Sequence, residues 1–286
     1  MFFRNKKLAV CLILLFLVSI GCTRINSAQG WSGALINGSH LILTSMDGHI
    51  MVLDKQTGKH HWKPDLIRVN EKEEDKRASY GIPVVSKGIV FVGVYDGKIQ
   101  AIEEDTGRIV ETEVVSDDFE IIGGPLISNN KLYIGSSDGV LRSYILDFSN
   151  EQVSFNDDWE FKVGGEIWST PVVSDGILII TSLDHNIYAI EEDTGELIWK
   201  SATGGAIAAT PLVYNDTVYV GSFDSVFYAF DLPTGEEKWT FEKASNWYWG
   251  KPAIGGETIY IPSLDLSLIH ISEPTRRYAI SYAVFC

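Results

Sequence analysis

The residues best suited to chemistry in this sequence are aspartates that recur at nearly regular intervals. The series comprises Asp47, Asp96, Asp138, Asp184, Asp224 and Asp265. Repeated carboxylates could serve catalysis or hold a cation. However, several of them precede glycine, as in Asp96-Gly97, and such dipeptides favour tight hairpin turns. An aspartate in a turn can accept hydrogen bonds from its own local backbone. We therefore predict a structural role for the series and no catalytic residue.

The histidines do not form a metal-binding pattern. His60 and His61 are adjacent, and neighbouring residues of a strand point to opposite faces, so a shared metal ion is not expected. His40, His49 and His185 fall at predicted turns and strand ends, where we expect them to be solvated. The sequence therefore predicts no metal site.

A second group of residues is aromatic. Five prolines recur thirteen residues before an aspartate of the series: Pro83, Pro125, Pro171, Pro211 and Pro252. Three positions before each proline stand Tyr80, Ile122, Trp168, Ala208 and Trp249, with Trp31 at the corresponding place of the first unit and Trp247 and Tyr248 nearby. If the units surround an axis, these residues line one mouth of an axial channel. They could then stack on an extended peptide, a glycan or a planar ligand, or they could simply plug the channel or pack beneath loops.

Both series belong to one internal repeat with a period of 40 to 49 residues. In most units Thr-Gly follows ten residues after the aspartate, and in three units tryptophan follows fifteen residues after it. In the fifth unit these markers separate four short strands at 211–214, 217–223, 226–231 and 236–241. Each unit is therefore predicted to be a four-stranded antiparallel meander.

Several strands are apolar almost throughout, for example 176–180 and 226–230, so both faces of each sheet must be covered. Four-stranded units of this length cover both faces when they stack radially around an axis. The sequence predicts an all-β propeller of four-stranded antiparallel blades over residues 33–265, incomplete, with five blades and a partial sixth.

Segments 189–199 and 229–239 resemble the tryptophan-docking motif of quinoprotein-like β-propellers, which carry PQQ-type repeats. The resemblance implies that each indole packs between blades over a Thr-Gly turn. The residues it assigns to this docking are Trp62, Trp199, Trp239, Gly58, Gly107, Gly195 and Gly235. Glu111 replaces the second tryptophan, Phe148-Ser149 replaces the third Thr-Gly, and Trp159 follows an insertion. We expect the blades at these departures to be looser.

The N-terminus resembles a lipoprotein signal. Basic residues precede an apolar run at 8–20, which is short for a membrane span and typical of a signal peptide. Ser19-Ile20-Gly21-Cys22 resembles the bacterial lipobox, which implies that 1–21 is removed, that Cys22 is lipidated and that 22–32 forms a tether and the start of the ring. A conventionally cleaved or uncleaved signal is the alternative. Because Cys22 has no partner cysteine within 22–265, we expect no disulfide.

The last 21 residues break the repeat. After Asp265 the pattern requires a turn, a third strand, Thr-Gly and tryptophan, but His270 and Arg276 occupy positions that require a small residue and glycine. Residues 266–286 resemble the translation of a sequencing adapter. We predict a non-native tail, with a divergent last strand as the alternative.

The net charge of −15 disfavours binding to nucleic acid or to anionic lipid heads. The resemblance extends to the propeller lipoproteins of the outer-membrane β-barrel assembly machinery. It implies a lipid-anchored, non-catalytic scaffold in the cell envelope that binds envelope proteins or peptides and needs no cofactor. The lipid would anchor the protein to the periplasmic face of an outer membrane or to the extracellular face of a cell membrane. The alternative is a fragment of a PQQ-dependent dehydrogenase with calcium, although no Cys-Cys pair typical of those enzymes is present.

Overall fold

The computed structural model describes residues 33–45, 48–62, 67–68, 78–149, 152–242, 244–265, 267–272 and 280–284, all within one compact unit. Every regular element in these ranges is a strand, and the strands form six four-stranded sheets. Across the same ranges, we find no helix with the length and apolar character that crossing a membrane requires. Cys22, Trp31 and Asp47 lie outside the described residues.

The strands pair in chain order within each sheet. The first two sheets comprise β1 (Leu35–Asn37), β2 (His40–Thr44), β3 (His49–Asp54) and β4 (Ile67–Arg68), then β5 (Val84–Ser86), β6 (Ile89–Val94), β7 (Lys98–Glu103) and β8 (Ile109–Val114). The next two comprise β9 (Leu126–Ser128), β10 (Lys131–Gly135), β11 (Val140–Asp147) and β12 (Ser154–Lys162), then β13 (Val172–Ser174), β14 (Ile177–Thr181), β15 (Asn186–Glu191) and β16 (Leu197–Ala202). The last two comprise β17 (Leu212–Val213), β18 (Thr217–Gly221), β19 (Phe227–Asp231) and β20 (Glu237–Phe241), then β21 (Ala253–Gly255), β22 (Thr258–Pro262), β23 (Ser267–Ser272) and β24 (Ile280–Val284).

The predicted antiparallel meander is confirmed. In the fifth sheet the strands fall within the predicted segments, and β18 pairs with both β17 and β19. The turn before β18 is made by Asn215 and Asp216, whose φ values are 48° and 51°. Two consecutive residues with positive φ are typical of the tight hairpin turn that matches strand twist.

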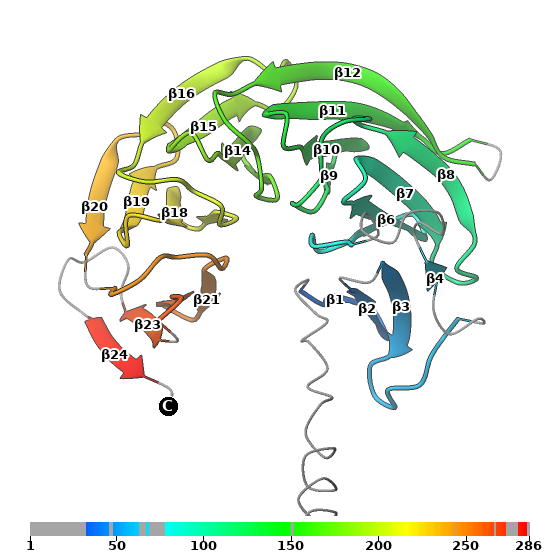
Figure 1. The fold of residues 1–286 in the computed structure, drawn as a ribbon, viewed down its shortest axis with the longest axis horizontal. Coiled ribbons are helices and arrows are strands. Elements are labelled where there is room, and N and C mark those ends of the chain that lie inside the picture. The colour runs from blue at the N-terminus through cyan, green and yellow to red at the C-terminus, as the bar shows by residue number, and fades with distance from the viewer. Residues whose placement is uncertain are drawn as a thin grey trace, which may run out of the picture. The chain divides into compact units, whose positions relative to one another are not determined.

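The sheets follow one another in chain order around a common centre, and the first and last sheets stand at the two ends of the arc (Figure 1). The first strand of each sheet lies toward the centre. The fourth strands β8, β12, β16 and β20 lie on the outside (Figure 1). The predicted propeller arrangement is confirmed, and it brings the segments before β5, β9, β13, β17 and β21 together near the axis.

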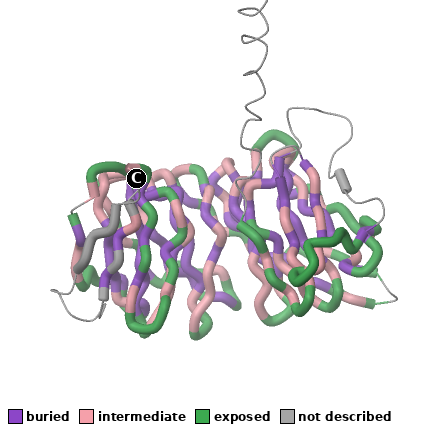
Figure 2. The backbone as a smooth tube through the Cα atoms, turned by 90° about the horizontal axis from the view of Figure 1, so that it is seen from below, coloured by how far each residue is buried: buried purple, intermediate pink, exposed green. Residues whose placement is uncertain are grey.

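Each sheet buries side chains on both faces because successive strand residues point to opposite sides. On β6, Val90 and Val92 join a core cluster with Ile42 of the first sheet, whereas Phe91 joins a cluster with Leu132 of the third sheet. Figure 2 shows the buried stretches running through the strands, with exposed segments mainly at the turns. Complete burial of one such side chain stabilises the fold by roughly 1.5–3 kcal/mol.

The sixth sheet has four strands, whereas the repeat predicts only the hairpin of its first two. β22 pairs with β23, and β23 pairs with β24. Ile269 and Ile271 of β23 join the core cluster of Ile259 and Tyr248. This segment therefore supplies apolar residues at the spacing that a third strand requires. That residues 266–286 are non-native stays a prediction.

Candidate axial binding site

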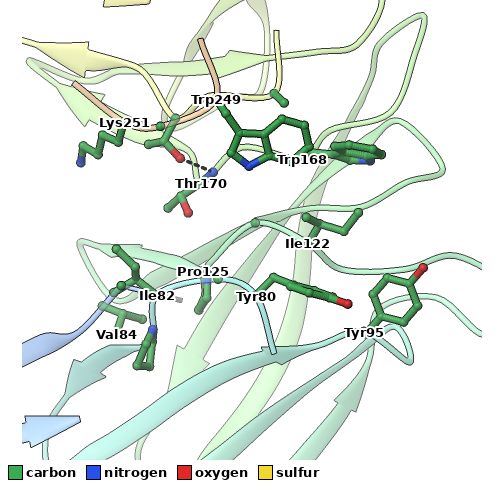
Figure 3. Close-up of a pocket in the computed structure, with 17 residues that line it drawn as sticks. Tyr80, Ile82, Val84, Tyr95, Ile122, Pro125, Trp168, Thr170, Trp249 and Lys251 are labelled. Carbon is green, nitrogen blue, oxygen red and sulfur yellow. Dashed lines mark hydrogen bonds between the residues drawn. The ribbon is translucent and has the colours of Figure 1, made fainter. Parts of the chain in front are cut away.

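A cavity of about 610 Å³ lies where the segments before five first strands meet. Its walls include the five residues that stand three positions before the repeated prolines: Tyr80, Ile122, Trp168, Ala208 and Trp249 (Figure 3). The structure thus brings together residues from sequence positions almost 170 apart, because the repeat places each at the same point of its blade. The cavity is concave and mostly apolar, as small-molecule and peptide sites usually are.

Close backbone contacts hold the inner segments in place. A Cβ added at Gly81 would collide with the backbone of Gly124 in the next unit, so glycine is required there. The backbone N–H of Gly124 donates to Oγ1 of Thr170 at 2.8 Å, and the N–H of Thr170 donates to Oγ1 of Thr210 at 3.0 Å. Figure 3 marks the second of these bonds. These bonds link successive blades directly beside the cavity.

Aromatic rings form a continuous stack at the mouth. The ring of Phe223 lies 4.9 Å from that of Trp247 and 5.4 Å from that of Trp249, with interplanar angles of 15° in both pairs. Trp249 in turn lies 5.9 Å from Trp168. Trp247 is 48% exposed and Trp249 is 37% exposed, so the stack presents open ring faces. Such offset pairs stabilise each other and form rigid apolar surfaces.

Polar groups border this aromatic end of the cavity. The indole Nε1 of Trp168 donates to Oε2 of Glu166 at 2.7 Å, which fixes the ring. Tyr80 meets Tyr95 edge to face at 5.5 Å. Burial, together with the carboxylates of Glu120 and Glu166, raises the pKa of Tyr95. This phenol therefore stays protonated at neutral pH and can donate a hydrogen bond.

Not every predicted mouth residue faces the cavity. Tyr248 is fully buried and packs 5.8 Å from Phe227 in the core between the fifth and sixth sheets. Trp247 belongs to the aromatic stack but does not line the cavity. Trp31 lies outside the described residues. The prediction for Tyr248 missed a signal, since Ile121, Ile167 and Ile207 occupy the same repeat position and are buried too.

Sequence reasoning also missed three residues of the site. Tyr95 and Phe223 both directly precede an aspartate of the repeated series, a position that could have been examined as a further aromatic column. Lys251 directly precedes a repeated proline and is the one charged residue among those that line the cavity. Lys251 is exposed, and the apolar wall beside it lowers its pKa through desolvation.

Three of the repeated aspartates accept hydrogen bonds from the backbone of their own turns. Oδ1 accepts from the N–H two residues later in Asp138, Asp184 and Asp224, at 2.9, 3.1 and 2.9 Å. Their second oxygen is also engaged: Asp224 Oδ2 accepts from the hydroxyl of Tyr228 at 2.6 Å. Asp96 instead pairs with Lys98 at 2.7 Å. This geometry is that of turn-stabilising carboxylates.

Three tryptophans, Trp62 before β4, Trp159 on β12 and Trp199 on β16, contact the following sheet. Nε1 of Trp62 donates to the carbonyl oxygen of Glu104 at 2.6 Å, beside the turn that contains Gly107. Trp159 lies against Gly195 and Trp199 lies against Gly235. Trp239 packs on Tyr219 and Phe227 of its own sheet. Gly58 has positive φ but no neighbour that a Cβ would meet.

The seam between the second and third sheets lacks an indole because Glu111 stands at the tryptophan position. Phe148 and Phe155 fill this seam instead, at 6.4 and 6.0 Å from Phe91 and edge to face with it. The insertion before Trp159 thus supplies apolar area of its own.

His40 is not solvated as predicted. Its Nδ1 lies 2.8 Å from Oε1 of Glu104, which also accepts from Asn37, and its ring lies 4.3 Å from that of His61. The second sheet provides the buried carboxylate that holds it. In the part of the chain that the structure describes, no three or more His, Cys, Asp or Glu side chains gather as a metal site would require.

The cavity lining does not fit a calcium-bound quinone. Calcium takes six to eight oxygen ligands, commonly carboxylates, and no Asp or Glu is among the residues that line the cavity. The carboxylate of Glu166, which contacts the aromatic stack, already accepts from Trp168.

Comparison with known proteins places this fold in a family. A family model described as outer membrane protein assembly factor BamB matches residues 46–150 and 149–273. The BamB protein of Yersinia pestis is 30% identical over 119 residues, 38% of this chain and 29% of that protein. The BamB protein of Nitrosomonas eutropha is 21% identical over 201 residues, 68% of this chain and 44% of that protein. The matched regions thus span less than half of these curated relatives.

Other similarities are more distant or shorter. The quinoprotein alcohol dehydrogenase PedH of Pseudomonas putida is 30% identical over 114 residues, 37% of this chain but 18% of that enzyme. The crystal structure of BamB from Moraxella catarrhalis matches with a TM-score of 0.70 and 19% identity, over 89% of this chain and 77% of that one. The computationally designed Ika8 protein matches with a TM-score of 0.63 and 15% identity, over 87% of this chain and 88% of that one. With a family model matched over most of its length, the chain belongs to the family described as outer membrane protein assembly factor BamB.

Proposed function

We propose that this chain is an exported, lipid-anchored and non-catalytic scaffold that binds envelope proteins or peptides during outer-membrane protein assembly. The observation that carries the proposal is the open aromatic stack at the mouth of the axial cavity. Rigid aromatic side chains supply most of the binding energy at many protein interfaces. The names of the relatives support the assembly role, and the apolar lining supports an extended peptide as the group bound.

The stack suits a chain segment that has not yet folded. Trp247 and Trp249 leave part of their indoles exposed, and each aromatic group of a partner that packs on them removes a large apolar area from water. The cavity behind them, about 610 Å³, offers room for several side chains. Such a site holds apolar segments without sequence-specific hydrogen bonds.

Binding of a urea-unfolded outer-membrane β-barrel protein, diluted into buffer and followed by fluorescence anisotropy, tests this proposal. Trp249→Ala and Trp168→Ala should weaken binding about tenfold or more, as hot-spot residues do, without lowering the melting temperature. Tyr260→Ala is the matched control, because Tyr260 is also 37% exposed but lies outside the cavity lining. Loss of folding in the tryptophan variants with unaltered binding of the folded fraction would instead assign the rings to packing.

The lipid anchor needs a separate test, because Cys22 lies outside the described residues. Expression in a bacterium fed radiolabelled palmitate should label the full chain and should not label Cys22→Ala. The variant should also leave the membrane fraction. Unlabelled wild-type protein would indicate a conventional signal peptide.

The alternative function is that of a quinone-dependent dehydrogenase, which the similarity to PedH favours. Addition of pyrroloquinoline quinone, Ca²⁺ and a primary alcohol should give no dye reduction above the protein-free rate. Saturable, calcium-dependent dye reduction would replace the scaffold proposal with the enzyme.

A further inference from the structure

The residue directly before the repeated proline lines the axial cavity in four of the five units. In the successive units it is Ile82, Gly124, Thr170, Thr210 and Lys251, and all of these except Gly124 line the cavity. Gly124 and Thr170 use the position for hydrogen bonds between blades. A neutral residue therefore satisfies the fold at this position, and the ammonium group of the sixth unit is an addition.

Lys251 has no polar partner among the residues that the structure describes. Among the described residues, no hydrogen bond or ion pair holds its ammonium group, although the chain as a whole carries a net charge of −15. The charge of Lys251 is left available for a group that enters from outside.

The cavity has an aromatic part and a cationic part. In Figure 3, Tyr95 and Trp168 lie toward one end, and Lys251 lies toward the other with Val84 opposite. Trp249, which belongs to the aromatic stack, is separated from Lys251 by Gly250 alone. A ligand that spans the cavity would therefore meet apolar rings along most of its length and one positive charge.

Building on the proposed function, we propose that the axial cavity binds a carboxylate attached to an aromatic or aliphatic body. The ammonium group of Lys251 pairs with the carboxylate, and Trp249 and Trp168 pack against the body. The ammonium group at the cavity wall can pair with a carboxylate through charge-assisted hydrogen bonds. A single cation suits a single negative charge, so a quinone with three carboxylates or a phosphate backbone would remain largely unpaired here.

This chemistry has two sources: a free small carboxylic acid, or a carboxylate carried by a polypeptide. Isothermal titration of the full chain with four probes separates them. The small probes are 3-phenylpropionate and its uncharged amide. The peptide probes are acetyl-Gly-Gly-Phe with a free carboxyl group and the same peptide as the amide.

We expect the acid of at least one pair to bind about tenfold or more tightly than its amide, the effect of one charge-assisted hydrogen bond. The pair that shows the difference identifies the source. Lys251→Met should remove the difference, and Lys251→Arg should retain it. Lys59→Met, an exposed lysine outside the cavity lining, is the control and should behave as wild type.

Equal affinity for acid and amide, or an unchanged difference in Lys251→Met, would overturn the inference. If Trp249→Ala then weakened both probes equally, the cavity would remain a binding site for apolar groups, as the proposed function requires. If no probe bound wild-type protein while the unfolded barrel protein did, the inference would also fail and the scaffold proposal would stand. Melting temperatures of all variants confirm that they are folded.

Discussion

The indole ring of Trp199 lies against Gly235 of the following sheet, and its Nε1 donates a hydrogen bond of 2.8 Å to the carbonyl oxygen of Leu232. A Cβ placed on Gly235 would come within 2.5 Å of the ring. Trp159 and Gly195 repeat the contact one blade earlier. The tryptophan and the glycine are 36 residues apart in both pairs, so the repeat period of the sequence fixes how successive sheets meet.

The first prediction separates this contact from backbone strain. Gly235 and Gly176 both have positive φ, 71° and 75°, but a Cβ on Gly176 would meet nothing within 4 Å. Gly176→Ala should therefore lower the free energy of unfolding only through backbone strain, by about 1–2 kcal/mol. Gly235→Ala should lower the free energy of unfolding by at least about 1 kcal/mol more, because the indole of Trp199 must move. Urea unfolding measures both, and equal losses would contradict the docking role of Trp199.

The second prediction concerns the hydrogen bonds beside the cavity. Thr170→Val keeps the shape of the side chain but removes the acceptor for the N–H of Gly124. A donor left without a partner costs about 1–3 kcal/mol, so the free energy of unfolding should fall by that amount. Thr112→Val on the exposed face of β8 is the control and should be nearly neutral. An equal effect of both substitutions would show that the inner bond adds nothing.

The third prediction is a loss of stability at alkaline pH. Burial and the bond to Asp224 raise the pKa of Tyr228 to about 12, from about 10 in the unfolded chain. The contribution of Tyr228 to the free energy of unfolding is complete below about pH 10. It is lost as the pH rises toward 12, because only the unfolded tyrosine ionises in that window. Burial and the bond to Asp184 raise the pKa of Tyr188 in the same way.

Urea unfolding from pH 8 to 11.5 should show this decline, and Tyr228→Phe should make it shallower by about 1 kcal/mol per pH unit at most. Tyr214→Phe, in a turn of the same sheet, should leave the slope unchanged. If the free energy of unfolding of Tyr228→Phe fell with pH as steeply as that of wild type, groups other than Tyr228 would cause the alkaline loss of stability.

Local features of the fold could be predicted because the repeat displays them several times. The turn role of Asp184 and Asp224 follows from their spacing, and the strands of the fifth unit follow from its apolar runs. The prediction groups Tyr248 with its neighbours Trp247 and Trp249, which are exposed, although Tyr248 shares a repeat position with the apolar residues Ile121, Ile167 and Ile207. Its orientation depends on Gly221, where an added Cβ would collide with it. The same contact joins Gly93 to Ile121 and Gly135 to Ile167, and it is a tertiary contact that periodicity alone does not show.

The site itself was predictable only in part. The positions of Trp168 and Trp249 follow from the proline register, because identical blade positions converge on the axis. Phe223 enters the stack from the turn before β19, and a turn residue's reach toward a neighbouring blade is a tertiary property. Glu166 is likewise fixed by its bond to Trp168. Sequence periodicity thus locates the mouth but does not show which rings meet there.

The last prediction tests whether Lys251 is present for binding rather than for folding. Thr170 and Thr210 occupy the same repeat position and serve the fold without charge. Lys251 is exposed, so its replacement by an uncharged residue should cost the fold little. Lys251→Thr should therefore leave the free energy of unfolding within about 0.5 kcal/mol of wild type, while abolishing the preference for the 3-phenylpropionate or peptide acid over its amide. Lys59→Thr should change neither quantity. A less stable Lys251→Thr variant would show instead that the aliphatic stem of the lysine packs as part of the cavity wall, and the charge would then be incidental to its position.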